Sequence, residues 1–191
     1  NIDDLLHEAC ASFNEGALAP AVVETVKGYL LDRLPAHYDE QGVSVDVLRS
    51  VTAVGTDSFG DIDSRSRAVT AFAGTDAAEA LAAANKRVAN ILAKVREPIG
   101  EVNAELLREP AEIALSGALD RSRECLAAAV ADNDFPEALN QLALLRRDVD
   151  SFFDTVLVNA EDKTLRLNRL ALLHELRAQF LKVADLAVLA R

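Results

Sequence analysis

The sequence contains no methionine and no tryptophan, and it has only two cysteines among 191 residues. Cys10 and Cys125 form no CxxC pair, so we expect reduced thiols rather than a disulfide framework or a thiolate zinc site. No apolar run approaches the roughly 20 residues that would span a bilayer. The acidic start NIDDLLHEAC predicts no signal peptide. Because methionine is absent and the chain begins at Asn1, we expect a fragment or trimmed product of a larger protein.

The sequence also lacks the patterns that mark known catalytic sites. His7, His37 and His174 are isolated, so no histidine pair has the spacing of metal ligands. The eight glycines are scattered and form no GxxxxGK[ST] phosphate loop, and there is no GxSxG elbow. We therefore predict no catalytic residue and no metal site in this chain. A stand-alone helical enzyme is the weakest functional interpretation.

Composition favours a folded, helical chain. Half of the residues are hydrophobic, which is ample for a core and excludes disorder. Alanine and leucine dominate, and strand-type alternation is nearly absent. We predict an all-α antiparallel bundle of about seven to eight helices, with no significant sheet. The chain should form one helical domain, residues 1–191, and the Pro- and Gly-containing stretch 97–110 is where subdomains 1–97 and 98–191 would separate.

Periodicity and end signals place the individual helices. They predict helices over residues 22–34, 45–51, 64–73, 76–97, 111–133, 136–156 and 163–189. Pro20 is expected to open the first of these. Ser44, Thr75, Asp134 and Asp162 are expected to cap later ones, because their side-chain oxygens can accept the free N–H groups of a first turn.

Charge is distributed unevenly along the chain. Lys and Arg number 20 against 31 Asp and Glu, a net charge of −11, which taken alone argues against a polyanionic partner. Residues 64–96, however, carry six basic and two acidic side chains, and residues 155–191 carry six and four. We therefore expect one local basic surface on an acidic body, with weak and salt-sensitive RNA binding.

The first basic segment contains a cationic strip. On a helical wheel, Lys86, Arg87, Asn90 and Lys94 fall within an arc of about 100°, opposite an apolar face. Such a strip can bind phosphates through its charge, and the amide of Asn90 can bond a base edge. The alternative is a solvated helix face whose cations pair with neighbouring acids. Sequence favours that alternative but does not exclude RNA binding.

The last predicted helix places a cation within its apolar stripe. A buried Arg169 needs a partner, because desolvating an unpaired charge is costly. Asp154 and Asp185 are the predicted partners, and a structural ion pair is favoured over a ligand contact. Arg166 and Arg177 flank the stripe, where they can reach solvent or a ligand.

Several segments resemble one protein family in the same order. FFDTVLVNAEDKTLRLNRLALLHELRAQFLKVADLAVL (152–189) resembles the C-terminal end of the bacterial glycyl-tRNA synthetase beta subunit. The matching positions are Phe152, Phe153, Asp154, Val156, Val158, Asp162, Arg166, Asn168, Arg169, Leu170, Phe180, Val183, Ala184 and Asp185. LAAANKRVANILAK (81–94), FGDIDSRSRAVTAFA (59–73) and LDRLPAHYDEQGVSVDVLRSV (31–51) resemble the same subunit. The resemblance thus covers nearly the whole chain. The chain departs from the family at Leu157 and Asn159, where the family commonly has methionine. Near its C-terminal end the chain has ADLAVL where the family usually has ADISLL.

The resemblance implies a fold, a location and partners. It implies the helical C-terminal domain of that cytoplasmic subunit, of the DALR anticodon-binding type, and a non-catalytic role within a glycine–tRNA ligase. The alpha subunit of such enzymes makes glycyl-adenylate with ATP and magnesium, so no cofactor is expected in this chain. Expected partners are the anticodon region of the glycine tRNA, the alpha subunit and the rest of the beta subunit, without membrane or DNA.

RNA contact is therefore assigned to polar side chains of the two basic segments. Only seven Phe and two Tyr are present, so recognition should depend more on Arg, Lys and Asn than on an aromatic platform. The candidates are Lys86, Arg87, Asn90, Lys94, Arg166 and Arg177. The competing hypothesis is an acidic helical module that docks synthetase subunits without RNA contact, which suits the net charge of −11.

Overall fold

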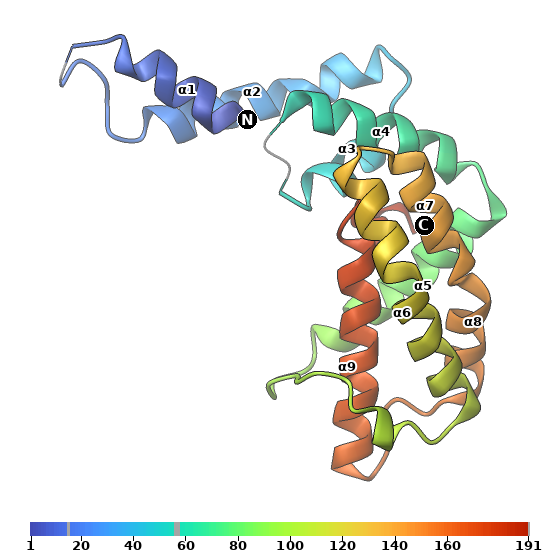
Figure 1. The fold of residues 1–191 in the computed structure, drawn as a ribbon. Coiled ribbons are helices and arrows are strands. Elements are labelled where there is room, and N and C mark those ends of the chain that lie inside the picture. Colours follow the sequence, from blue (N-terminus) through green and yellow to red (C-terminus); the bar gives the residue numbers. More distant parts are fainter. Residues whose placement is uncertain (15, 56–57, 191) are drawn as a thin grey trace.

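The computed structural model describes residues 1–14, 16–55 and 58–190. These residues form nine α-helices, two short 3-10 turns and no strand, which confirms the all-α prediction (Figure 1). The helices are α1 (Ile2–Ala11), α2 (Val22–Asp39), α3 (Val45–Thr52), α4 (Phe59–Ala73), α5 (Asp76–Leu92), α6 (Pro110–Ala131), α7 (Phe135–Leu144), α8 (Arg146–Thr155) and α9 (Lys163–Phe180). The turns are η1 (Ala104–Leu106) and η2 (Leu186–Leu189).

The predicted N-caps are confirmed. The Ser44 hydroxyl accepts the N–H of Val47 at 3.3 Å, and the Thr75 hydroxyl accepts that of Ala78 at 3.2 Å. The side chains of Asp134 and Asp162 accept N–H groups of α7 and α9 in the same way. The prediction for Pro20 was wrong, because α2 begins two residues later, after a turn.

Three helices are clearly shorter than their patterns predicted. The last of them, predicted over residues 163–189, ends at Phe180 and is followed by a turn and η2. Residues 136–156 form two helices, because the chain turns at Leu145, which is buried, before α8 begins. This break raises the number of helices above the predicted seven to eight, as does α1, which the sequence patterns did not place. α5 ends at Leu92, not at the predicted residue 97. The chain from there to α6 is irregular except for η1, as predicted for residues 97–110.

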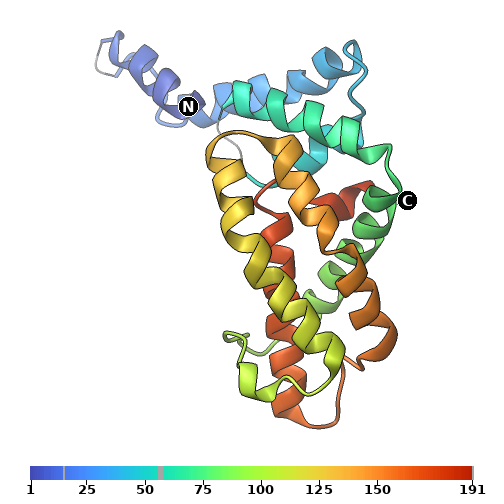
Figure 2. The same cartoon turned by 45° about the vertical axis from the view of Figure 1, so that its right-hand side comes forward.

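Consecutive long helices of the body alternate in direction. In Figures 1 and 2, α5 runs down the body, α6 runs up, α7 and α8 run down, and α9 runs up. One hydrophobic cluster extends from Tyr38 to Leu186, with Phe135, Phe152 and Phe180 fully buried. The cluster includes residues on both sides of residue 97, and the division into two subdomains there stays a prediction.

A helical hairpin of α1 and α2 projects from the body (Figures 1 and 2). α1 packs along α2, and α2 reaches the body through α3. The side chains of Leu5, Phe13 and Tyr29 are more than half exposed on this hairpin. None of the described helices combines the length and the apolar character that crossing a membrane requires.

The segment after α9 is held by helices from the first half of the chain. Arg65 of α4 is buried, and its Nη1 donates to the carbonyl oxygens of Lys182 and Val183 at 2.6 and 2.7 Å. The N–H of Asp185 donates to the carbonyl of Ser50 at 2.8 Å. These bonds fix the position of η2, which packs against α3 and α5.

Candidate nucleic-acid interface

α5 lies between α8 and α9 and contacts both helices. Its buried face includes Leu81, Ala84 and Val88, and this packing turns the opposite face toward solvent. All four members of the predicted strip, namely Lys86, Arg87, Asn90 and Lys94, are exposed. The buried face of α5 therefore leaves Lys86, Arg87 and Asn90 exposed on the helix, and Lys94 is exposed in the turn after Leu92.

The cations of the strip are not neutralised within the chain. In residues 1–14, 16–55 and 58–190, no carboxylate lies within ion-pair distance of Lys86, Arg87 or Lys94. Lys86 donates to the backbone carbonyl of Ala190 at 2.9 Å. The guanidinium carbon of Arg87 lies over the ring of Phe153, 4.2 Å from its centroid. The strip thus lacks the acidic partners that the solvated-face alternative supposed.

Asn90 faces α9 instead of α8. It lines a hollow of about 540 Å³ between α5 and α9, together with Leu92, His174, Arg177 and Leu181. The hollow brings two of the predicted RNA-binding residues, Asn90 and Arg177, to one place. It also includes His174, one of the three isolated histidines.

Arg166 and Arg177 are both engaged in ion pairs inside the fold. Arg166 Nη2 lies 3.8 Å from a carboxylate oxygen of Glu97. Arg177 donates to the Asp185 carboxylate at 2.8 Å and to Oδ1 of the buried Asn85 at 3.0 Å. Both guanidinium groups are only partly exposed. Their contact with RNA stays a prediction, and they are less available than the α5 strip.

The predicted partners of Arg169 were wrong. Arg169 is buried as expected, but its Nε donates to Glu112 of α6 at 2.5 Å, and its Nη1 donates to the Leu157 carbonyl at 2.8 Å. Asp185 pairs with Arg177 instead. Asp154 is exposed, because Phe152 takes the buried position of α8.

Glu112 stabilises both a helix start and a buried cation. Its carboxylate accepts the N–H groups of Arg108 and Glu109 at 2.8 Å each, which completes a capping box at the start of α6. Burial by itself would raise the pKa of Glu112. The hydrogen bonds from Glu109, Arg169 and Arg108 outweigh burial and hold that pKa below its ordinary value. Glu112 is therefore charged at neutral pH.

Phe153 follows a fully buried phenylalanine in α8, yet only part of its own side chain is buried. Its neighbour Phe152 is fully buried, and the two rings meet edge to face at a centroid distance of 5.6 Å. Consecutive helical positions point about 100° apart, so on α8, where Phe152 takes the buried position, the next ring falls toward the edge of the buried face. That spacing was the signal for a ring at the surface.

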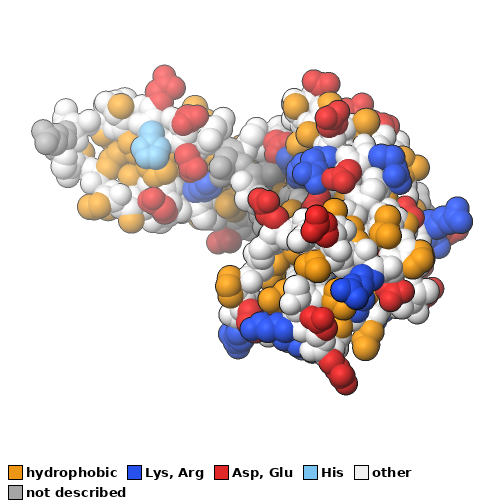
Figure 3. Space-filling model, turned by 60° about the horizontal axis from the view of Figure 1, so that its bottom comes forward, with side chains coloured by type: hydrophobic (Ala, Val, Ile, Leu, Met, Phe, Trp, Pro, Cys, Tyr) orange, Lys and Arg blue, Asp and Glu red, His pale blue; other side chains and the backbone are white. Residues whose placement is uncertain are grey.

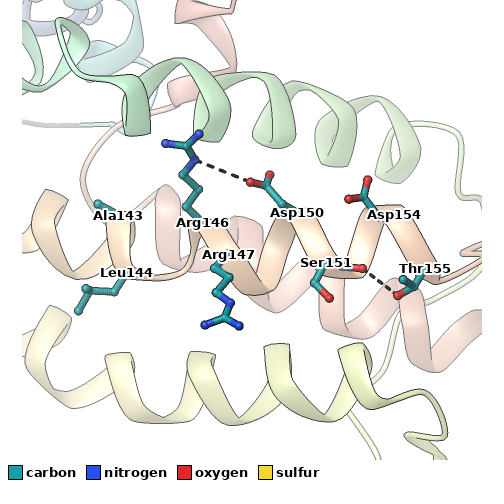
Figure 4. Close-up of a pocket in the computed structure, with 8 residues that line it drawn as sticks. All are labelled: Ala143, Leu144, Arg146, Arg147, Asp150, Ser151, Asp154 and Thr155. Atoms are coloured by element: carbon teal, nitrogen blue, oxygen red, sulfur yellow. Dashed lines mark hydrogen bonds and ion pairs between the residues drawn. The ribbon is translucent and has the colours of Figure 1, made fainter.

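A shallow hollow of about 670 Å³ lies on the outer side of α8 (Figure 4). Arg146, Asp150 and Asp154 point to one side of the helix, and Arg147 points to the other. Arg146 Nε lies 3.7 Å from Asp150 Oδ2. The lining carries both signs of charge, so this hollow is not a basic site.

Charge is also mixed elsewhere on the surface. On the face shown in Figure 3, basic side chains of the helical body form small separate groups beside acidic ones. No His, Cys, Asp and Glu side chains of the described residues are grouped so that they could hold a metal ion. The α5 strip is therefore a local feature, defined by its four residues.

Comparison with known proteins yields one family and a set of relatives. The family described as "DALR anticodon binding domain" matches residues 81–186. The glycine–tRNA ligase beta subunit of Haemophilus influenzae (strain ATCC 51907) is 46% identical over 99% of the chain and 28% of its own length. The subunit of Actinobacillus pleuropneumoniae serotype 7 is also 46% identical, and that of Salmonella typhi is 44% identical, with the same coverage.

The matched span coincides with the structural elements of the candidate interface. Residues 81–186 include most of α5 and all of α6, α7, α8 and α9. The chain spans about 28% of the length of these curated relatives. The protein belongs to the DALR anticodon binding domain family.

Proposed function

We propose that this chain binds the anticodon region of a glycine tRNA as part of a ligase beta subunit. In that role it supports ATP-dependent glycylation at an active site carried by the alpha subunit. The observation that carries the proposal is the exposed α5 strip, which has no acidic partners and lies inside the matched span. An anticodon loop is single-stranded, so it offers both phosphates and splayed base edges to such a surface.

The three types of side chain in the strip suit different parts of an RNA loop. Lys94 offers a compact charge for a phosphate, and Asn90 offers an amide that can donate to and accept from a base edge. Arg87 offers a planar group with several N–H donors. Residues 1–63 carry three basic and twelve acidic side chains, so they repel RNA and favour approach at α5.

We expect Lys94→Ala to flatten the salt dependence of tRNA binding. Each lost phosphate contact should reduce the slope of log K against log[salt] by about 0.7 for a single strand. Asn90→Ala should weaken binding without changing that slope, because it removes no charge. The measurement is the affinity of the complete ligase for glycine tRNA at several salt concentrations.

The matched control is Arg67→Ala on α4, which lies outside residues 81–186. Arg67 is exposed and pairs with Asp63 at 2.8 Å, so this variant removes a surface cation without touching the strip. The control should bind like the parent. If Lys94→Ala, Arg87→Ala and Lys86→Ala all keep the parent slope, the strip is only a solvated face. A tRNA with an altered anticodon should compete poorly if recognition is at the anticodon.

A docking role is the second candidate, and the α1–α2 hairpin favours it. Its exposed Leu5, Phe13 and Tyr29 lie outside the matched span, on a segment rich in acidic residues. In this alternative, the hairpin docks another part of the synthetase and the chain makes no RNA contact. Leu5→Ser with Phe13→Ser should then weaken assembly of the ligase, while Lys94→Ala leaves tRNA affinity unchanged.

A further inference from the structure

The contact between Arg87 and Phe153 joins an exposed arginine to a half-buried ring. The guanidinium carbon lies over the ring at 4.2 Å from the centroid, well within the range of a cation–π interaction. Phe153 is itself supported by the fully buried Phe152, whose ring it meets edge to face. The core of the domain therefore fixes the ring, and the ring fixes the guanidinium. Arg87 as a whole residue is exposed.

Two other arginines of the described residues lie over aromatic rings, and both differ from Arg87. Arg65 lies over Phe135 at 4.3 Å, but both are buried and Arg65 is bonded to three oxygens. Arg33 lies over Tyr29 on the acidic hairpin, outside the matched span. Arg87 alone among these three combines an exposed guanidinium, a basic segment and a place within residues 81–186.

The N–H groups of Arg87 are also available. No hydrogen bond or ion pair engages its guanidinium within the part of the chain that the structure describes. By contrast, Arg169 and Arg177 each bond a carboxylate and a further oxygen. A planar cation with one face on a ring, one face in solvent and a free donor edge can stack on a base and bond its edge at once.

We infer that Arg87 and Phe153 form a stacking site for one unpaired nucleobase. This inference rests on the proposed tRNA function and names the part of the RNA that the site takes. The base stacks on the outer face of the guanidinium, so that base, Arg87 and Phe153 form three layers. α8, which supplies Phe153, also carries Asp150 and Asp154, and these acids disfavour a phosphate there but not a neutral base.

Neighbouring strip residues place the rest of the nucleotide. Asn90 is one turn along α5 from Arg87, on the side of α5 that faces α9, and Lys94 is exposed in the turn that follows the end of α5 at Leu92. Asn90 can bond the edge of an adjacent base, and Lys94 can hold the phosphate that follows. The site therefore reads a short single-stranded segment rather than a duplex.

The test separates stacking from charge. Arg87→Lys keeps the positive charge but removes the flat guanidinium, and Phe153→Leu keeps Arg87 but removes the ring beneath it. In the complete ligase, each should weaken glycine tRNA binding about 5- to 100-fold, the range expected for losing one base stack. Neither should change the salt slope, whereas Lys94→Ala should. Arg67→Lys is the matched control and should bind like the parent.

A second readout identifies the base. Glycine tRNA transcripts that each carry 2-aminopurine at one anticodon-loop position report stacking by loss of fluorescence. One position should be quenched on binding to the parent ligase and should regain emission with Arg87→Lys. Arg87 is exposed, so this variant should fold even if Phe153→Leu does not.

Each outcome is decisive. The inference is overturned if Arg87→Lys binds like the parent and keeps every quenched position, while Lys94→Ala still weakens binding. In that case the proposed tRNA function stands without the stack. If the parent ligase shows no quenching and Lys94→Ala, Arg87→Lys and Arg67→Lys all bind equally, both the stack and the proposed role of the strip fail.

Discussion

Replacing Arg169 with methionine should destabilise the domain by about 3–5 kcal/mol, the usual result of breaking a buried ion pair on one side. Arg169 joins α9 to α6 through Glu112 and to the α8–α9 connection through the Leu157 carbonyl. Without it, Glu112 is left as a buried carboxylate with only two backbone N–H donors. The measurement is urea denaturation followed by helical circular dichroism, read as the shift of the midpoint at constant slope.

A double variant shows how much of the stability lost in Arg169→Met comes from leaving the Glu112 carboxylate buried without its cation. Arg169→Met with Glu112→Leu leaves no buried charge, so it should be more stable than Arg169→Met with Glu112 intact. Some loss should remain, because Glu112 also caps α6. If the double variant is as unstable as the sum of the two single variants, the pair is not coupled and this explanation fails.

Glu112 also makes stability depend on pH. Its pKa in the folded state is lowered, so it contributes stability above the ordinary value of 4.5 and loses that contribution as pH falls below it. The free energy of unfolding of the parent should therefore decline below about pH 4.5. The Glu112→Gln variant lacks this contribution. The difference in free energy of unfolding between the parent and this variant should therefore become smaller as the pH falls. A constant difference across this range would contradict the assignment.

Arg65→Met should cost about 2–5 kcal/mol, since it takes the Arg65 donor from the buried carbonyl of Val183 and the half-buried carbonyl of Lys182 and removes a cation from the Phe135 ring. Arg65 is nearly fully buried and also pairs with Asp61 at 2.9 Å. Methionine fills much of the same volume, so the loss reports the bonds more than a cavity.

Arg67→Met is the control for this second variant. Arg67 lies on the same helix and pairs with Asp63 in the same i, i+4 arrangement, but its side chain is 67% exposed. Arg67→Met should change the free energy of unfolding by no more than about 0.5 kcal/mol. Both variants are measured by denaturation. If Arg65→Met and Arg67→Met lower the free energy of unfolding equally, the bonds from Arg65 to Lys182 and Val183 do not stabilise the protein.

Local signals predicted local structure well. Helix periodicity and capping residues such as Thr75 act over a few residues, so the sequence is enough to place them. The exposure of the α5 strip followed from the same periodicity. The break at Leu145 did not, because Leu145 has good helix propensity and tertiary packing sets the turn there.

Pairings between distant residues could not be predicted in this way. Arg169 and Glu112 are 57 residues apart, and several carboxylates closer in sequence were equally plausible partners. The contact of Arg87 with Phe153 depends on how α8 turns relative to α5, which follows from the packing of the whole body. The exposure of Lys86, Arg87, Asn90 and Lys94 was therefore predictable, whereas the contacts that these residues make were not.

The bonds between α4 and the segment after α9 also govern how the protein can fold during synthesis. Arg65 bonds to carbonyls that are 117 and 118 residues further along the chain, and Lys86 bonds to one 104 residues away. A ribosome adds about 5–20 residues per second, so α4 and α5 wait for seconds before these partners exist. Until then Arg65 and the apolar faces around it are exposed to chaperones. These contacts of α4 and α5 therefore form only after the segment that follows α9 has been synthesised.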